Sequence, residues 1–285
     1  MPPFSDGFIE FMDAKRTLND VYGLDSIKAW LRQDVALWRK NDLAALPKGY
    51  LLCGPVGTGK TYLVECLAGE ASVPVVKMKN FRDKWVGSSE GDLEKIFRLI
   101  HALGRCYVFI DEADQALGRR DSSSGDSGVS GMLAEEMGSS SNRGSVIWIL
   151  ASSRPDLIEV DLKRPGRVDV KIPLFPTSTK RASFDLLRML LKKRTIDLPA
   201  DSFAALEPSM PLLLTPGAAE ALAVKIYRVV RTSNSKLDEV MLASLRDYQN
   251  TVPPDIMRFQ INLAVAEASD LEFVPAIFRP TASSG

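Results

Sequence analysis

The segment GYLLCGPVGTGKTYLVECLAG, residues 49–69, is the most informative part of the chain, because three different patterns follow one another in it. The apolar run 49–53 is typical of a buried strand, and residues 60–70 have the spacing of a helix. Between them, residues 54–61 read G-x-x-x-x-G-K-T. This pattern, preceded by a strand and followed by a helix, predicts a loop that binds a chain of phosphate groups.

Each residue type in this loop has a physical use. Glycines allow successive backbone N–H groups to turn toward phosphate, and the helix that follows adds the positive end of its dipole. Lys60 can neutralise β- and γ-phosphate charge, and the Thr61 hydroxyl can bind Mg²⁺. The alternative is a glycine-rich turn with a solvated lysine, which the flanking strand and helix disfavour. The residues expected to contact the nucleotide are Gly54, Pro55, Val56, Gly57, Thr58, Gly59, Lys60, Thr61 and Tyr62.

A second strand-like run ends in carboxylates, since residues 107–114 read YVFIDEAD. Ligands bind at the carboxyl ends of parallel strands, so a phosphate loop elsewhere in the chain favours a functional role here over a solvated loop. Asp111 is expected to hold Mg²⁺ together with Thr61. Glu112 is expected to orient and polarise the water that attacks the γ-phosphate.

The rest of the chain predicts an α/β domain followed by helices. Alternation of strand and helix patterns implies a parallel sheet covered by helices on both faces. Further strands are expected at 73–78, 107–110, 146–151 and 168–174, and a helix at 91–103. Beyond residue 176 only helical spacing remains, at 181–193, 216–232, 237–248 and 254–268. We therefore expect an N-terminal arm (1–16), a large α/β domain (17–176), a small helical lid domain (177–279) and a disordered tail (280–285). The Ser- and Gly-rich segment 119–131 is expected to be a mobile loop.

Composition limits the classes of function. The 285 residues include 36 basic and 36 acidic side chains, so no net charge attracts nucleic acid or a membrane. The single histidine, His101, excludes a His-x-x-x-His metalloprotease centre within this chain and argues against Ser/His or Cys/His catalysis unless His101 itself supplies the base. Three scattered cysteines indicate neither a disulfide framework nor a zinc site. With no apolar run long enough to span a bilayer and no signal-peptide pattern at the start, a cytoplasmic protein is expected.

With these motifs in order, residues 17–268 resemble an ATPase module of the AAA clade within the AAA+ superfamily. The resemblance implies a P-loop NTPase fold with a helical lid, ATP and Mg²⁺ as cofactors, a homo-oligomeric ring of six subunits, and a protein substrate. Four more segments support the resemblance to this family: LNDVYGLDSIKAWL (18–31), DKWVGSSEGDLEKIF (83–97), WILASSRPDLIEVDLKRPGRVDVKIPLF (148–175) and TPGAAEALAVKIYRVV (215–230).

The resemblance also implies roles for individual residues. Adenine would contact the backbone near the first of these segments, and an aromatic pore loop in the second would grip the passing polypeptide. The third would supply a sensor beside the γ-phosphate and two arginine fingers that reach a neighbouring subunit's ATP. The residues are Val21, Tyr22 and Gly23 for adenine; Trp85, Val86 and Gly87 for the pore loop; Ser153 for the sensor; Arg164 and Arg167 for the fingers; and Gly217 and Ala218 for base and ribose. Each of these roles has a purely structural alternative. Trp85 could pack onto the core, the two arginines could form ordinary surface ion pairs, and the helix start at 217–218 could serve only as core.

Two departures from the family pattern bear on activity. Ser153 stands where asparagine is usual, and its hydroxyl has a shorter reach, so slower turnover is expected. Val168 replaces a phenylalanine beside the second finger. The leading hypothesis is a Mg²⁺-dependent ATPase that assembles into a ring and remodels, unfolds or translocates a protein. The alternative is an ATP-gated scaffold that hydrolyses slowly or not at all. A nucleic-acid motor is weaker, because the charge balance is neutral.

Overall fold

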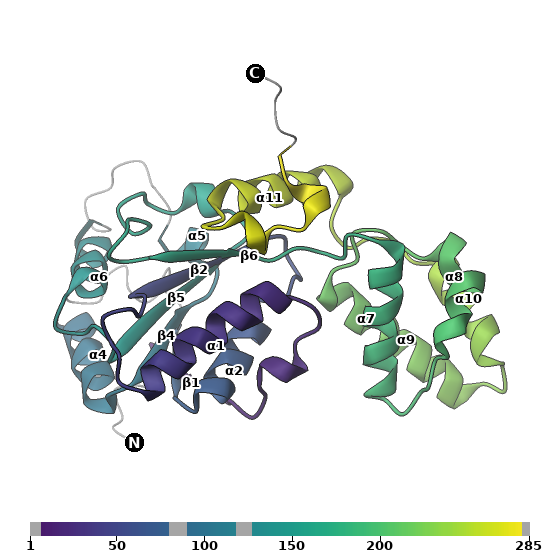
Figure 1. The fold of residues 1–285 in the computed structure, drawn as a ribbon, viewed down its shortest axis with the longest axis horizontal. Helices are drawn as coiled ribbons and strands as arrows, with labels where there is room; N and C mark the ends of the chain where they lie inside the picture. Colours follow the sequence, from purple (N-terminus) through teal and green to yellow (C-terminus); the bar gives the residue numbers. More distant parts are fainter. Residues whose placement is uncertain (1–6, 80–89, 118–126, 281–285) are drawn as a thin grey trace. The chain divides into compact units, whose positions relative to one another are not determined.

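The computed structural model describes residues 7–79, 90–117 and 127–280 (Figure 1). These residues form two compact units whose segments alternate along the chain. Unit 1 consists of Met1–Gly54, Lys60–Pro173 and Leu263–Val274. Unit 2 consists of Pro55–Gly59, Leu174–Asn262 and Pro275–Gly285. The domain limits drawn from the sequence remain a prediction.

Within the described residues, unit 1 is built on a six-stranded sheet with the order β1-β3-β4-β5-β2-β6. Strands β3, β4, β5, β2 and β6 run parallel to their neighbours, and β1 pairs antiparallel with β3 at one edge. The predicted α/β architecture is therefore confirmed. The strands are β1 (Ile9–Met12), β2 (Gly49–Cys53), β3 (Val75–Met78), β4 (Cys106–Ile110), β5 (Val146–Ser152) and β6 (Val170–Pro173).

Helices cover both faces of this sheet, as the sequence pattern predicts. Tyr50 and Ile149 are paired in register, and their side chains pack with Leu63 and Leu67 of α2. The preceding residue of β5, Trp148, points to the opposite face, where its ring lies 6.3 Å from the ring of Phe97 in α4. Side chains alternate between the faces of a strand, so α2 and α4 lie on different faces. The helices of unit 1 are α1 (Asp25–Arg39), α2 (Lys60–Ala71), α4 (Glu90–Leu103), α5 (Ala113–Ala116) and α6 (Ser127–Gly138).

The three central strands are buried along their whole length, which explains why the sequence identified them. Every residue of β2, β4 and β5 is buried. A strand buried on both faces reads as a continuous apolar run. Strand β1 was not predicted, because it is a four-residue edge strand in which two residues are exposed.

The predicted mobile loop at 119–131 is wrong for its last five residues. Residues 127–131 form the first turns of α6. Their Ser and Gly content is typical of a loop, but the helix is anchored further along by Leu133, Ala134 and Met137, which are buried. Tertiary packing of this kind overrides weak helix propensity. His101 of α4 pairs with Glu136 of α6 at 2.6 Å.

Unit 2 contains the predicted helices after residue 176. Two of them begin with a threonine cap: Thr179 accepts a hydrogen bond from the Ala182 N–H, and Thr215 accepts one from the Ala218 N–H. Helix α11 contributes residues to both units. The helices are α7 (Lys180–Lys192), α8 (Phe203–Leu206), α9 (Pro216–Thr232), α10 (Leu237–Arg246) and α11 (Pro254–Glu267).

No helix in the described ranges combines the length and the apolar character that crossing a bilayer requires. The predicted tail, apart from Pro280, lies outside the described residues.

Candidate active site

The loop between β2 and α2 has the backbone that its glycines predict. Gly57 and Gly59 have φ of 84° and 86°, in the left-handed region that residues with a side chain rarely adopt. The Thr58 hydroxyl donates a hydrogen bond to the Pro55 carbonyl at 2.8 Å and is buried. Helix α2 begins directly after Gly59, so its first N–H groups lie at the end of the loop. Such an N-terminus attracts anions.

Lys60 is the first residue of α2, and its ammonium group folds back to the start of the loop. Nζ donates a hydrogen bond to the Gly54 carbonyl at 2.8 Å. Burial lowers the pKa of Lys60 to about 8, although nearby anionic groups including Asp111, Asp114 and Glu112 act in the opposite direction. A phosphate beside Lys60 would raise that pKa again, because an opposite charge favours the protonated form.

Thr61 and Asp111 are in direct contact, although they are 50 positions apart in the sequence. The Thr61 hydroxyl donates to Asp111 Oδ2 at 3.1 Å, which joins the first turn of α2 to the end of β4. One carboxylate and one hydroxyl fit Mg²⁺, which binds through few protein oxygens together with water and substrate phosphates. A cage of three or more His, Cys, Asp or Glu side chains is absent from the described part of the chain.

Lys77 is a further member of the site that the sequence analysis missed. It lies on β3, and its Nζ is 2.8 Å from Asp111 Oδ2, the oxygen that also accepts from Thr61. The signal was a lysine inside the otherwise apolar strand VVKM. Its partner could not be read from the sequence, because Asp111 follows a different strand, β4, and lies 34 residues away.

Glu112 follows Asp111 and has an unusual backbone conformation. Its φ and ψ are 48° and 46°, in the left-handed region, and the residue is exposed at the start of α5. A residue other than glycine in this region costs roughly 1–3 kcal/mol and often marks a functional site. The Glu112 N–H donates to Asp111 Oδ1 at 3.1 Å.

The end of β5 meets the start of the loop. The Gly54 N–H donates to the Ser152 carbonyl at 3.3 Å. The buried Ser152 hydroxyl donates to Asp114 and accepts from the Arg154 N–H at 2.8 Å. Ser153, the expected sensor, is the next residue and is partly exposed. Ser152 and Asp114, the pair that holds this strand end against α5, were not predicted as functional residues.

Both expected finger arginines pair with Asp161. Arg164 Nη1 lies 3.0 Å from Asp161 Oδ1, and 67% of its side chain is exposed. Arg167 pairs with the other carboxylate oxygen, donates to the Asp161 carbonyl at 2.6 Å and is only 22% exposed. Neither arginine makes a described contact with the phosphate-binding loop.

The expected adenine segment lies beside the first turn of α2. The Tyr62 hydroxyl donates to the Asp20 carbonyl at 3.3 Å, directly before Val21. The Val21 carbonyl accepts from Lys28 Nζ at 3.3 Å. Gly23 has φ of 61°, as a tight turn requires. The structure thus brings residues 21–23 to the same helix that carries Lys60 and Thr61.

Within unit 2, the start of α9 contacts the loop residue Gly57. The Gly217 N–H donates to the Gly57 carbonyl at 2.9 Å. A side chain at Gly57 would place its Cβ 2.9 Å from Thr215 Oγ1, so this approach requires glycine. Ala218 follows in the same helical turn. The expected pore-loop residues Trp85, Val86 and Gly87 lie outside the described residues.

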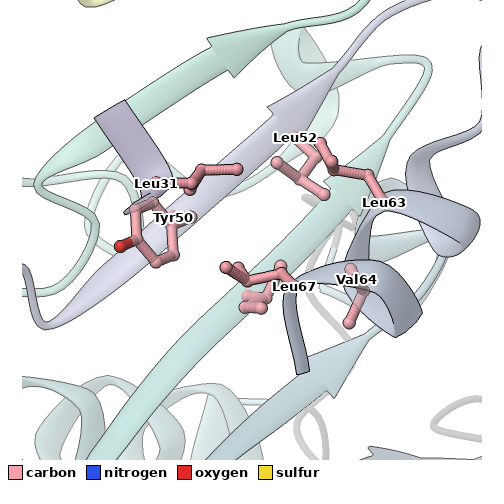
Figure 2. A pocket seen from close by; sticks show the side chains of 7 residues that line it. Leu31, Tyr50, Leu52, Leu63, Val64 and Leu67 are labelled. Carbon is pink, nitrogen blue, oxygen red and sulfur yellow. The ribbon is translucent and has the colours of Figure 1, made fainter. Parts of the chain in front are cut away.

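A small apolar cavity lies under α2 and is separate from this chemistry. Figure 2 shows the side chains around it, which come from α1, β2, α2 and β5. Its volume of about 10 Å³ is at the lower limit for one water molecule, and its walls are apolar. It is a packing gap and not a ligand site. The lining residues are Leu31, Tyr50, Leu52, Leu63, Val64, Leu67 and Ile149.

Residues 50–175 match the family model described as "ATPase family associated with various cellular activities (AAA)". This match covers the sheet from β2 to β6 and every proposed catalytic residue. It confirms the P-loop α/β fold that the sequence predicted.

Curated relatives extend the similarity beyond this range. The chain is 33% identical over 236 residues to the "ATP-dependent zinc metalloprotease FtsH 2" of Symbiobacterium thermophilum, covering 78% of this chain and 40% of that protein. It is 34% identical over 220 residues to FtsH 1 of Salinibacter ruber, covering 72% of this chain and 31% of that protein. Identity to "Protein SAV" of Sulfolobus acidocaldarius is 35% over 187 residues, covering 61% and 24%. The chain thus spans less than half the length of each relative.

Proposed function

The chain belongs to the AAA clade of the AAA+ P-loop ATPases, and from that premise we propose that it is a Mg²⁺-dependent ATP hydrolase that assembles into a ring and remodels, unfolds or translocates a protein. The contact between Thr61 and Asp111 is the observation that carries this proposal. It unites the phosphate-binding loop and the carboxylate strand, which are far apart in sequence, at one point.

In the proposed mechanism the chain positions the nucleotide and stabilises charge. Backbone N–H groups of residues 54–61 and the Lys60 ammonium would hold the phosphates. Mg²⁺, held through Thr61 and Asp111, would neutralise charge on the β- and γ-phosphates. Glu112 would accept a hydrogen bond from the attacking water and align it with the γ-phosphate.

Completion of the site by a neighbouring subunit is a further part of the proposal. Arg164 is exposed, and among the described residues its ion pair is with Asp161 on the surface, where such a pair contributes little. Its guanidinium could exchange Asp161 for the phosphates of an adjacent subunit, where it would stabilise charge in the transition state. Hydrolysis would then depend on assembly.

A protein substrate is supported by the relatives and by the sequence. Two of the similar proteins are named ATP-dependent zinc metalloproteases. This chain has a single histidine and therefore contains no His-x-x-x-His zinc centre. We propose that it supplies the ATP-driven part of such work, with Trp85 and Val86 as the residues that grip a polypeptide.

A second candidate function is an ATP-gated scaffold with slow or no hydrolysis. Ser153 favours it, because a hydroxyl in place of an amide gives a shorter and less rigid contact to phosphate or water. Asp111, Glu112 and the two arginines count against it, since a scaffold has no need of them.

The rate of ATP hydrolysis as a function of protein concentration separates the two functions. The parent chain is compared with Glu112→Gln and Arg164→Ala, and nucleotide binding is measured in parallel. We expect the activity per subunit to rise with concentration and to fall at least 100-fold, about 3 kcal/mol, in both variants while binding persists. A parent that binds ATP but does not hydrolyse it at any concentration would support the scaffold instead.

A further inference from the structure

Lys77 brings a second ammonium group into the candidate active site, and no role of the family residues accounts for it. Its Nζ lies 2.8 Å from Asp111 Oδ2, and both side chains are about one-quarter exposed, at 26% and 25%. The same Nζ lies 5.4 Å from the centre of the Phe109 ring, over which the lysine extends. Lys77 thus extends from strand β3 and places its ammonium group against the Asp111 carboxylate.

Asp111 already has several partners from the protein. Oδ2 accepts from Lys77 and from the Thr61 hydroxyl, and Oδ1 accepts from the Glu112 N–H. Lys60, the other nearby lysine, instead donates to the Gly54 carbonyl. The two ammonium groups therefore occupy different positions, one at the loop and one at the carboxylate.

We infer that Lys77 is a positioning residue that serves as a built-in cation at Asp111, so that nucleotide binding depends less on Mg²⁺ than it would with a neutral residue at this position. This inference rests on the proposed function of the same site. The physical reason is competition: a divalent cation held through Asp111 must share the carboxylate with a positive charge that is already 2.8 Å from it. Like charges at such separations repel strongly in a partly buried site.

The same charge should strengthen the binding of nucleotide when no metal is present. Bringing a polyphosphate near Asp111 costs repulsion between anions, and the Lys77 ammonium offsets that cost. Removal of the charge should therefore weaken metal-free binding and strengthen the binding of Mg²⁺ in the complex. An ion pair that only stabilises the strand would change neither quantity.

The chain offers a matched set of variants. Lys77→Met removes the charge and keeps a long apolar side chain over Phe109, whereas Lys77→Arg keeps the charge. Lys79→Met is the control, because Lys79 lies two residues further on, pairs with Glu10 at 2.8 Å and has no described contact with Asp111. Thermal unfolding shows which variants fold, and Lys77→Gln replaces Lys77→Met if the latter does not.

The experiment is calorimetric titration of ATP into each folded variant, first in EDTA and then across a series of Mg²⁺ concentrations. For Lys77→Met we expect roughly tenfold weaker ATP binding in EDTA and a roughly tenfold lower half-saturating Mg²⁺ concentration. Lys77→Arg and Lys79→Met should follow the parent.

Two results would overturn the inference. Curves for Lys77→Met that superimpose on those of the parent would show a purely structural ion pair, while the proposed ATPase function would stand. A parent that binds no ATP at any Mg²⁺ concentration, and that does not differ from Lys60→Ala, would remove the proposed function and this inference together.

Discussion

Asp161 binds two arginines that differ in what they contribute to the folded chain. Arg164 reaches it from the surface, whereas Arg167 is mostly buried and also donates to the Asp161 carbonyl. An exposed ion pair contributes about 0–1 kcal/mol, and a partly buried charged hydrogen bond contributes more. The two proposed fingers should therefore be separable by experiment.

We predict that Arg167→Ala lowers the free energy of unfolding of the isolated chain by about 1–3 kcal/mol, because it removes a partly buried group and leaves Asp161 less well paired. Arg164→Ala should change it by less than about 0.5 kcal/mol. Urea unfolding followed by circular dichroism measures both. Equal losses in the two variants would contradict the different burial of the arginines.

How far single residues can be predicted depends on where their partners lie. Lys60, Thr61 and Asp111 were predicted as site residues because each belongs to a motif with a fixed local pattern. Lys77 was not found, because its only signal is a charge within a buried strand and its partner lies 34 residues away. The pairing of both arginines with Asp161 likewise depends on a turn whose shape the sequence does not reveal.

At the scale of elements, two lysines hold the end of α11, and one of them, Lys171, lies on the sheet. Glu267 accepts hydrogen bonds from Lys163 and from Lys171 of β6, and it is 17% exposed. Burial alone would raise the pKa of Glu267, but the hydrogen bonds and charges of the two lysines outweigh it, so the pKa lies below its ordinary value. A carboxylate with a lowered pKa stabilises the fold above its unfolded pKa and loses this effect as the pH falls.

Glu267→Gln should therefore lower the free energy of unfolding at pH 7 by about 1–3 kcal/mol, because two partly buried lysines lose their anion. The difference from the parent should shrink as the pH falls through the lowered pKa, below about pH 4.5. Thermal unfolding at a series of pH values provides the comparison. A difference that stays constant down to acid pH would mean that the lysines do not act through the charge of Glu267.

The elements themselves were predicted where burial or capping leaves a clear pattern. Strand β2 and helix α9 have the boundaries that the sequence predicted, since one is a continuous apolar run and the other starts at Thr215-Pro216. Edge strand β1 was missed because half of it faces solvent. The start of α6 was missed because its helical state depends on packing later in the same helix.

For the whole molecule, the phosphate-binding loop links the two units in the chain. Residues 55–59 group with unit 2, whereas Gly54 and Lys60 on either side belong to unit 1. A nucleotide held by residues 54–61 would bind the folded loop and not the unfolded chain. Ligands that bind only the folded chain stabilise it by mass action.

We predict that saturating ATP, at about 100 times its Kd, raises the free energy of unfolding by about 2.7 kcal/mol. Lys60→Ala should abolish most of this gain. Differential scanning fluorimetry with and without nucleotide tests the prediction, and Lys79→Met is the matched control, because Lys79 has no role in the proposed site and pairs with Glu10 at 2.8 Å. An equal gain in Lys60→Ala and the parent would place the nucleotide elsewhere.

The interleaving of the two units has a consequence for the order in which the protein can fold during synthesis. Unit 1 includes Leu263–Val274, and this segment buries Phe273 and Val274, with the Phe273 ring 5.5 Å from that of Trp30 in α1. These residues leave the ribosome only after the helices of unit 2 have been made. A nascent chain that has reached Pro173 contains the whole sheet but still exposes the surface that this segment covers, so we expect it to need a chaperone until translation has passed residue 274.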